Sequence, residues 1–493
     1  MKIKKGETMK KSTDNTTLKH QLNPMHVWAI AFGCIIGWGS FVNPGKKFLP
    51  NSGVMGTAIA MLLGAAVMII IAFSYAYMVP KHPKAGGEFT FTKACFGKRT
   101  AFLCGWFLVA AYLTNVPMNS TAIGLIVDGI DGTADILKFG FHYTIAGFEV
   151  YFGEMIFAMA ILILFAVMNI MGVKKAGIIQ TVLSSLLAVS VFTLTVSAVV
   201  SSKTQGINME PIWGFDKSSA MAAGATTENI SEFAHSGTMG IASAILATFA
   251  IAPWAFVGFD TIPQVAEEFK FSYKKIIVIM VVAIAFGCFV YVSNNTVAAI
   301  ALENWHDRVM AGEWVLLVAA EELLGVFGKV LIGVAVSCAV LSGIMGFYLA
   351  SSRLMYSMAK ESYLPKVFGV VDKKYGTPKN AIIFCMLISL SGPILGREAL
   401  GWFVDMSAIG ASLGFFFTCA SSLRTQKRDG DGSKALKVLS FVGVIFSSAF
   451  MVLQLIPIPG LSGVHFGTES YLMLLIWIAI GAVFYGVQRK KLI

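Results

Sequence analysis

Long apolar stretches separated by short polar segments run along almost the whole chain of 493 residues. Each stretch is about 20 residues long, the length that an α-helix needs to cross a hydrocarbon core of about 30 Å. The pattern therefore predicts an all-α polytopic membrane protein with about twelve transmembrane helices. The predicted spans lie near 26–49, 53–79, 101–127, 154–171, 177–200, 239–264, 275–300, 327–358, 380–395, 402–423, 436–457 and 469–488.

Two of the predicted spans contain residues that interrupt an α-helix. The first carries Gly33, Gly37 and Gly39 within seven residues, and the sixth carries two prolines and a glycine within 249–269. Glycine inside a helix costs roughly 0.5–1 kcal/mol relative to alanine. An unpaired backbone group in lipid costs several kcal/mol. Gly33 and Gly37 alone would also fit a helix-packing motif, but the matching interruption in the sixth span favours local unwinding.

Broken helices leave N–H groups free where one half-helix starts and C=O groups free where the other half-helix ends. The first end attracts an anion and the second a cation, so a zwitterion such as an α-amino acid matches both. In a chain of two five-helix halves, the first and sixth spans occupy corresponding positions. Such a pair of interrupted spans is the best sequence indication of a transporter's binding site.

Composition and charge agree with a protein embedded in a lipid bilayer. Hydrophobic residues make up 56% of the chain and charged residues 13%, whereas a soluble domain has about 25% charged residues. Most Lys and Arg residues lie near the two termini and in the loops after even-numbered spans, which predicts cytoplasmic termini. The net charge of +11 then reflects topology, so no nucleic-acid partner is expected. Residues 1–25 are polar and lysine-rich, so no cleavable signal is expected.

The sequence gives no indication of a metal site, a cofactor or an enzyme. None of the seven cysteines falls in a predicted outer loop, and none forms a CxxC pair, so neither disulfides nor metal binding is expected. No Ser/His/Asp or metal-binding cluster lies at one depth, which disfavours a membrane-embedded enzyme. The chain also lacks the filter repeats or charged rings of a channel.

Four stretches of the chain form a set of motifs in a fixed order. They are GCIIGWGSF at 33–41, PKAGGEFTFTKACFG at 83–97, NIMGVKKAG at 169–177 and RLMYSMAKESYLPKVFGVVDKKYGTP at 353–378. In this order they resemble motifs of the amino acid–polyamine–organocation (APC) superfamily of secondary transporters. Phe89 and Phe91 replace the tyrosines that are usual in the second motif.

The resemblance implies a 5+5 inverted-repeat core with broken helices 1 and 6, alternating access around a central site, and two peripheral helices. The expected parts are a cytoplasmic tail at 1–25, a first repeat at 26–200, an extracellular loop at 201–238, a second repeat at 239–423, a cytoplasmic loop at 424–435, and spans 11 and 12 with a short cytoplasmic C-terminus at 436–493.

At the first break, the resemblance implies that backbone N–H groups around Trp38, Gly39 and Ser40 meet a substrate carboxylate, and Gly37 is expected to belong to the same binding site. The carbonyl near Ile35 would meet the α-ammonium group. An interfacial position is the alternative for a tryptophan, but Trp38 stands twelve residues into the span. Relatives mostly carry a small residue there, so its ring is expected to reshape the pocket.

At the second break, carbonyls near Trp254 and Val257 would also meet the ammonium group, and Trp254 would act as an aromatic gate. Gly258 and Phe259 would shape the wall of the site.

Further site candidates come from neighbouring spans. Asn115 in the third span and Phe347 in the eighth fall where relatives contact substrate or carry a gating aromatic. Helix kinking and core packing are the alternatives for these two residues.

Ion coupling is the most open part of the hypothesis. Asp260 is the one acidic side chain expected deep in a span, and an intramembrane carboxylate is a functional candidate by default; structural pairing is its alternative. Some proton-driven relatives carry a lysine in the fifth span, where this chain has Leu186 and Leu187. Sodium-coupled relatives of the wider fold use two hydroxyls in the eighth span, where Ser342 is followed by Gly343. Proton coupling is therefore favoured over sodium, and exchange remains open.

The function expected from these features is secondary transport of amino acids or closely related amines across the cytoplasmic membrane. Coupling to H+ or Na+ and exchange of one solute for another are both compatible with the motifs. The alternatives are a polyamine or organocation transporter of the same fold and a membrane sensor of amino acids that does not transport them.

Overall fold

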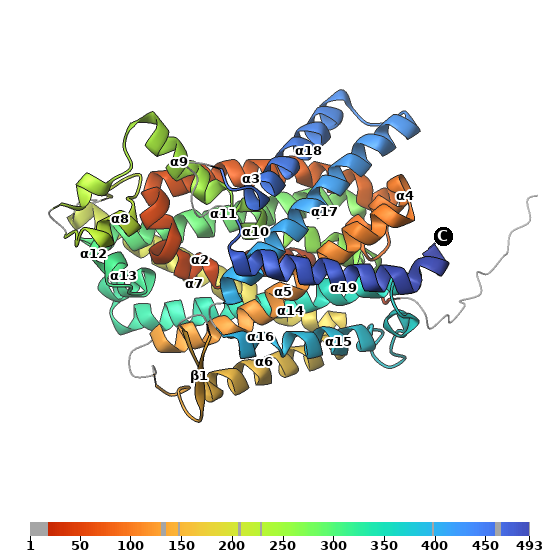
Figure 1. Ribbon diagram of the computed structural model, residues 1–493, viewed down its shortest axis with the longest axis horizontal. Helices are drawn as coiled ribbons and strands as arrows, with labels where there is room; N and C mark the ends of the chain where they lie inside the picture. Colours follow the sequence, from red (N-terminus) through yellow and green to blue (C-terminus); the bar gives the residue numbers. More distant parts are fainter. Residues whose placement is uncertain are drawn as a thin grey trace, which may run out of the picture.

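The computed structural model is a bundle of long α-helices that run side by side (Figure 1). The structure describes residues 18–129, 135–145, 148–205, 209–226, 229–396, 399–458 and 465–492. Residues 1–17 of the predicted N-terminal tail, and 206–208 and 227–228 of the predicted extracellular loop, lie outside this described part. Within it, ten helices are long and apolar enough to cross a membrane, and two shorter apolar helices accompany them. The predicted all-α polytopic fold is confirmed.

The first predicted span is divided as its glycines suggested. Helix α1 (Pro24–Ile35) ends before the glycine pair, and α2 (Gly39–Asn43) resumes the helical path. A π-helical turn, η1 (Pro44–Phe48), leads directly into α3 (Leu49–Lys81), the second span. The chain bends inside α3 at Gly53, close to the boundary that the sequence predicted between the two spans.

The sixth predicted span is divided too. Helix α9 (Gly237–Phe249) is followed by the short α10 (Ala252–Ala255). Two 3-10 turns, η3 (Phe259–Thr261) and η4 (Pro263–Glu268), complete the span. Both interruptions that the glycines and prolines predicted are therefore present.

The other predicted spans are regular helices joined by short elements. The remaining spans are α5 (Lys98–Gly129), α6 (Phe152–Ile170), α7 (Val173–Gln205), α11 (Ile276–Ile300), α14 (Val326–Lys360), α15 (Lys379–Ser389) with α16 (Gly392–Leu395), α17 (Ala399–Asp429), α18 (Lys434–Leu455) and α19 (Thr468–Leu492). The connecting elements are α4 (Gly87–Phe96), the hairpin β1 (His142–Ile145) and β2 (Phe148–Tyr151), α8 (Lys217–Ala222), η2 (Ile230–Phe233), η5 (Tyr273–Lys275), α12 (Trp305–Met310), α13 (Val315–Leu324) and η6 (Lys366–Gly369).

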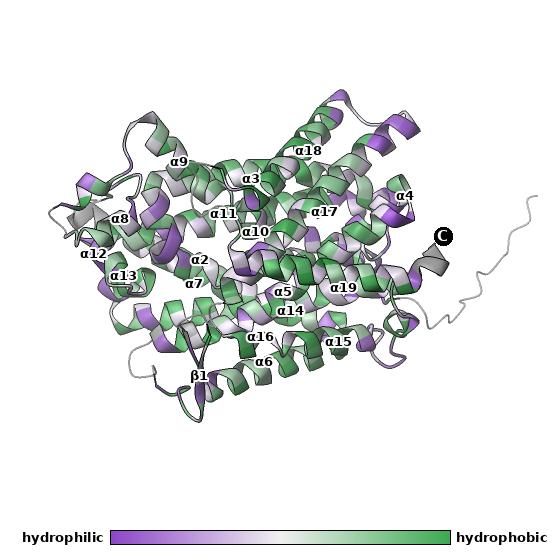
Figure 2. Cartoon of the chain, viewed as in Figure 1, coloured by the Kyte–Doolittle hydropathy of each residue, from purple (hydrophilic) through white to green (hydrophobic). Residues whose placement is uncertain are grey.

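Helix α1 lies inside the bundle, against α7, α11 and α14. All of its residues from Ala29 to Ile35 are buried. The last two helices lie at the periphery: 11% of the most apolar stretch of α19 is buried, against 83% for α5. Apolar residues cover the helices along their length, while polar residues gather toward helix ends and loops (Figure 2), as a surface surrounded by hydrocarbon requires.

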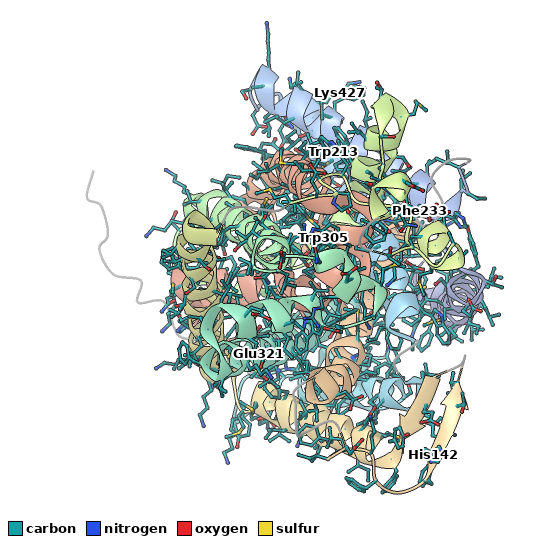
Figure 3. All side chains as sticks on the ribbon, turned by 90° about the vertical axis from the view of Figure 1, so that its left-hand side faces the viewer. His142, Trp213, Phe233, Trp305, Glu321 and Lys427 are labelled. Atoms are coloured by element: carbon teal, nitrogen blue, oxygen red, sulfur yellow. The ribbon has the colours of Figure 1, made fainter. Side chains whose placement is uncertain are left out.

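Loop elements close one end of the bundle, seen end-on in Figure 3. The ring of Trp305, at the start of α12, is fully buried there and packs against Phe215 with 5.9 Å between ring centroids. His142, on the β-hairpin, lies at the edge of the same view (Figure 3). These loop elements lie over the ends of the long helices in this view (Figure 3).

Candidate functional site

The break in the first span leaves several backbone N–H groups unused. Ile36 turns out of the helix with φ −97° and ψ 101°, and its N–H still donates to Phe32 O at 3.0 Å. Among the described residues, the N–H groups of Gly37, Trp38 and Gly39 have no protein acceptor. Ser40 differs, because its N–H and Oγ both donate to Gly37 O, at 3.3 and 3.0 Å. The free donors at this break are therefore the N–H groups of Gly37, Trp38 and Gly39, whereas the N–H of Ser40 is already used within the chain.

The break in the sixth span touches the end of α1 at Gly258. This residue has φ +145° and ψ −44°, a conformation that L residues other than glycine rarely adopt. A Cβ placed on it would lie 2.5 Å from Ile35 N and 2.8 Å from Ala31 O. Only glycine allows the two broken helices to meet at this distance.

Carbonyl groups at the same junction fall into two sets. The Ile35 carbonyl accepts from Tyr291 Oη at 3.3 Å, and the Trp254 carbonyl accepts from Val257 N–H at 3.1 Å. The carbonyls of Ile36 and Val257, by contrast, have no donor within the described part of the chain. Free N–H and free C=O groups thus occur together where the two breaks meet.

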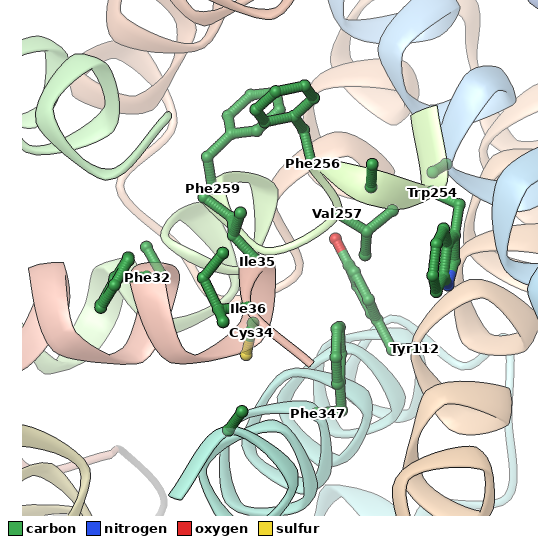
Figure 4. Close-up of a cluster of buried hydrophobic side chains, with 14 of the residues drawn as sticks. Phe32, Cys34, Ile35, Ile36, Tyr112, Trp254, Phe256, Val257, Phe259 and Phe347 are labelled. Carbon is green, nitrogen blue, oxygen red and sulfur yellow. The ribbon is translucent and has the colours of Figure 1, made fainter. Parts of the chain in front are cut away.

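Aromatic rings surround this junction. The Trp254 ring lies over the backbone of Gly39, since a Cβ on Gly39 would be 2.4 Å from Trp254 Cη2. The rings of Trp38 and Trp254 have centroids 6.4 Å apart. Tyr112 and Phe347 stack side by side, with centroids 6.4 Å apart (Figure 4). The two tryptophan rings therefore lie beside each other at the start of α2.

Phe259 packs against two other aromatic rings. Its ring lies against Phe415 at 5.4 Å and edge-on to Tyr75 at 5.6 Å between centroids. These contacts hold η3 against α17 and α3, so a packing role is what the structure displays for this side chain.

Two asparagines in α5 have distinct surroundings. Asn115 donates to Ser407 Oγ on α17 and to Ala111 O, both at 2.6 Å, which ties two helices together. Asn119, one turn further on, donates to Asn115 O at 2.8 Å, and its buried Oδ1 has no partner among the residues that the structure describes. This oxygen lies 3.2 Å from the position that a Cβ on Gly37 would take. Asn119 therefore faces the first break, a role that its spacing of four residues from Asn115 could have suggested.

Asp260 is fully buried directly behind the second break. Its Oδ1 accepts from Gly258 N–H at 2.7 Å, and its Oδ2 accepts from Tyr112 Oη at 3.0 Å. Glu88, at the start of α4, is also fully buried and accepts from Tyr75 Oη at 2.7 Å and from Gln264 Nε2 at 2.5 Å. Sequence reasoning missed Glu88 because it lies in a polar loop, although that loop is one of the family-like motifs.

Ser342 lies where α14 passes the middle of α1. Its Oγ is 3.1 Å from Gly33 O, to which it can donate. Gln180 on α7 donates through Nε2 to Ser342 O at 3.1 Å and to Ala29 O at 3.4 Å. Leu186, in contrast, is 47% exposed on the outer surface. The polar side chains that α7 presents to α1 here, Gln180 and Ser184, are thus neutral.

A polytopic bundle in which two interrupted helices meet, with free backbone donors and acceptors between them, has the architecture of secondary transporters. Among the described residues, no group of three metal-binding side chains is close enough to hold a metal ion. The sequence profile of the family described as Amino acid permease matches residues 22–483. The chain belongs to this family, which confirms the resemblance to the APC superfamily.

Individual relatives show moderate identity. The chain is 27% identical over 376 residues to the large neutral amino acids transporter small subunit 2 of Rattus norvegicus, covering 76% of this chain and 64% of the relative. It is 26% identical over 377 residues to the Asc-type amino acid transporter 1 of Mus musculus, with the same coverage of 76% and 64%. An uncharacterized transporter of Rhizobium meliloti (strain 1021) is 26% identical over 415 residues, covering 82% of this chain and 78% of the relative. The match thus spans 64% of the length of the two mammalian proteins.

Proposed function

We propose that this protein is a secondary transporter that moves amino acids across a cell membrane by alternating access. The observation that carries the proposal is the junction of the two broken helices, where unpaired N–H and C=O groups lie together within the described residues. Buried backbone groups without partners are costly, and a zwitterionic ligand satisfies both kinds at once. The names of the mammalian relatives, which refer to amino acid transport, support the same ligand class.

In this proposal the substrate carboxylate binds the N–H groups of Gly37, Trp38 and Gly39. The α-ammonium group binds the carbonyls of Ile36 and Val257, and each hydrogen bond to a charged group contributes about 1.5–3 kcal/mol. Because the backbone binds both charged groups that all α-amino acids share, selectivity among amino acids depends on the surroundings of the substrate side chain.

The substrate side chain then faces aromatic rings. Trp38, Trp254, Tyr112 and Phe347 are among the rings beside the junction. The Asp260 carboxylate behind it is already bonded to Gly258 and Tyr112. Neutral amino acids with apolar side chains fit these surroundings better than polyamines, which need unengaged carboxylates. In this proposal the Trp38 ring, whose centroid lies 6.4 Å from that of Trp254, borders the substrate side chain.

Proton coupling is part of the proposal, and sodium coupling is not. A sodium ion between the first and eighth spans needs free oxygen ligands. The Ala29 and Ser342 carbonyls already accept hydrogen bonds from Gln180 Nε2, and Ala29 O also accepts from Ser184 Oγ at 3.0 Å. Gly33 O lies 3.1 Å from Ser342 Oγ, which can donate either to it or to Ala339 O at 3.0 Å. Asp260 is the titratable group that contacts the break itself.

Uptake by the purified full-length chain in proteoliposomes tests the function. We expect saturable counterflow of neutral amino acids that is unchanged when choline replaces sodium. Gly39→Val should abolish it, because the new side chain would meet the Trp254 ring 2.4 Å from its Cβ. The matched control is Gly401→Val on α17, where no atom lies within 4 Å of the added Cβ. Counterflow that survives Gly39→Val, or a flux that does not saturate, would overturn the proposal.

A further inference from the structure

Two fully buried carboxyl groups lie on either side of one phenol. Tyr112 Oη is 3.0 Å from Asp260 Oδ2 and 3.4 Å from Glu88 Oε1. Asp260 belongs to the broken sixth span, whereas Glu88 comes from α4, in the loop that follows the second span. A single phenol thus connects the helix break to a carboxyl group that reaches it from a polar loop.

The groups around this pair are neutral. Tyr75 on α3 and Gln264 on η4 donate to Glu88, and Gln264 Nε2 is also 3.3 Å from Tyr112 Oη. Cys34 on α1 is near Asp260, and Cys104 on α5 is near Glu88.

Among the described residues, no Lys, Arg or His forms an ion pair with either carboxyl group. The buried Arg353 on α14 instead pairs with Glu268, at 3.2 Å.

Two carboxylates without a cation cannot both stay ionised in such surroundings. Burial disfavours the charged form, and a second negative charge nearby disfavours it further. Glu88 lies outside the membrane-spanning helices; burial raises its pKa above the usual range of a glutamate, and the neighbouring Asp260 carboxyl adds to the shift. The pair therefore holds at least one proton near neutral pH, and a phenol lies between the two positions for that proton.

We propose that Asp260, Tyr112 and Glu88 form a proton-binding relay that carries the coupling proton between the break in the sixth span and the side of the protein on which α4 lies. This inference rests on the proposed function. When the proton moves, the Asp260 Oδ2–H bond breaks and the proton binds Tyr112 Oη, while the phenol proton passes to Glu88 Oε1. The phenol is restored, one proton is transferred and no other reactant is required.

The relay is connected to the substrate site through Gly258. Ionised Asp260 accepts the Gly258 N–H bond at 2.7 Å, and charge-assisted bonds of this kind are about twice as strong as neutral ones. Protonation of Asp260 weakens the hydrogen bond that it accepts from Gly258, the residue that contacts Ile35. Proton occupancy is thereby linked to the junction at which the substrate binds.

Accumulation driven by a pH gradient tests the inference. With the full-length chain in proteoliposomes, the readout is the ratio of amino acid accumulated with and without an inward gradient of one pH unit. One proton per substrate raises this ratio about tenfold. We expect Glu88→Gln, Asp260→Asn and Tyr112→Phe each to bring the accumulation ratio close to one. The control is Glu361→Gln, which removes a partly exposed carboxyl group that pairs with Lys93; this variant should keep the roughly tenfold ratio. Ratios as high in Glu88→Gln and Tyr112→Phe as in the unchanged protein would overturn the relay.

A second measurement uses the unchanged protein, so it does not depend on a variant that folds. Infrared difference spectra recorded on addition of amino acid should display a change in the C=O band of a protonated carboxyl group, and a spectrum without this change would overturn the relay. The two proposals fail differently. Without counterflow in the unchanged protein the transport function fails, whereas counterflow that no pH gradient stimulates refutes the relay alone.

Discussion

Replacing Gly258 by alanine tests whether the contact between the two broken helices holds the site together. Gly258 has φ +145°, and its added Cβ would lie 2.5 Å from Ile35 N and 2.8 Å from Ala31 O. Both atoms are backbone atoms of α1, so no side-chain rotation can relieve the contact. Either α1 moves or the sixth span does.

The size of the effect follows from two contributions. A residue held in a sparsely populated φ/ψ region costs about 1–3 kcal/mol. Ordinary van der Waals contact begins at 3.4 Å, so the backbones must separate by about 1 Å. In enzymes a misplacement of 1 Å can reduce the rate about 100-fold. We therefore expect Gly258→Ala to lower amino acid counterflow by at least about tenfold, with weaker binding in a thermal-shift assay.

Two control variants separate strain from contact. Gly237, at the start of α9 in the same span, has φ +67° and no atom within 4 Å of an added Cβ. Gly237→Ala therefore carries the backbone strain without the contact, and Gly401→Ala on α17 carries neither. Counterflow in Gly258→Ala equal to that in Gly237→Ala would refute the idea that the Gly258–Ile35 contact organises the site.

Three more variants examine single interactions. Asn119→Ala removes the free Oδ1 beside the first break and should weaken substrate affinity about tenfold in equilibrium binding. Asn115→Ala should instead chiefly lower the unfolding temperature. Weaker binding in Asn115→Ala than in Asn119→Ala would contradict the placement of Asn119 at the site. Arg353→Met leaves the buried Glu268 unpaired and should cost about 3–5 kcal/mol in chemical unfolding, most of which the double variant with Glu268→Leu should recover. Asp216 Oδ1 accepts a hydrogen bond from Ser219 N–H at 3.1 Å and caps α8. Asp216→Ala removes this cap, whose loss costs about 1 kcal/mol of helix stability, and should therefore speed hydrogen exchange in α8 about fivefold. Hydrogen bonds from Ser219 lower the pKa of Asp216 in the folded protein. The protection of α8 from exchange is therefore fully present above the unfolded pKa of about 3.9, and it is lost as the pH falls through the lower folded pKa. Protection that rises on acidification would contradict the cap.

The positions of the spans and of both interruptions could be predicted from the sequence. Apolar length and the backbone preferences of glycine and proline are local properties, so Gly37 and Gly258 marked the breaks without any knowledge of the packing. The sequence also selected Trp38, Val257 and Asp260, which lie at or directly behind the junction in the structure.

Which side chains face the junction was decided by tertiary structure. Asn119 rather than Asn115 leaves an oxygen free beside Gly37, because the rotation of α5 is set by its packing against α17 and α14. Glu88 reads as a solvated loop residue, yet it lies fully buried and bonded to Gln264, 176 residues away in sequence. A loop carboxyl becomes part of the buried site only when distant helices close around it. Local sequence therefore placed the breaks, whereas long-range packing placed the polar groups that surround them.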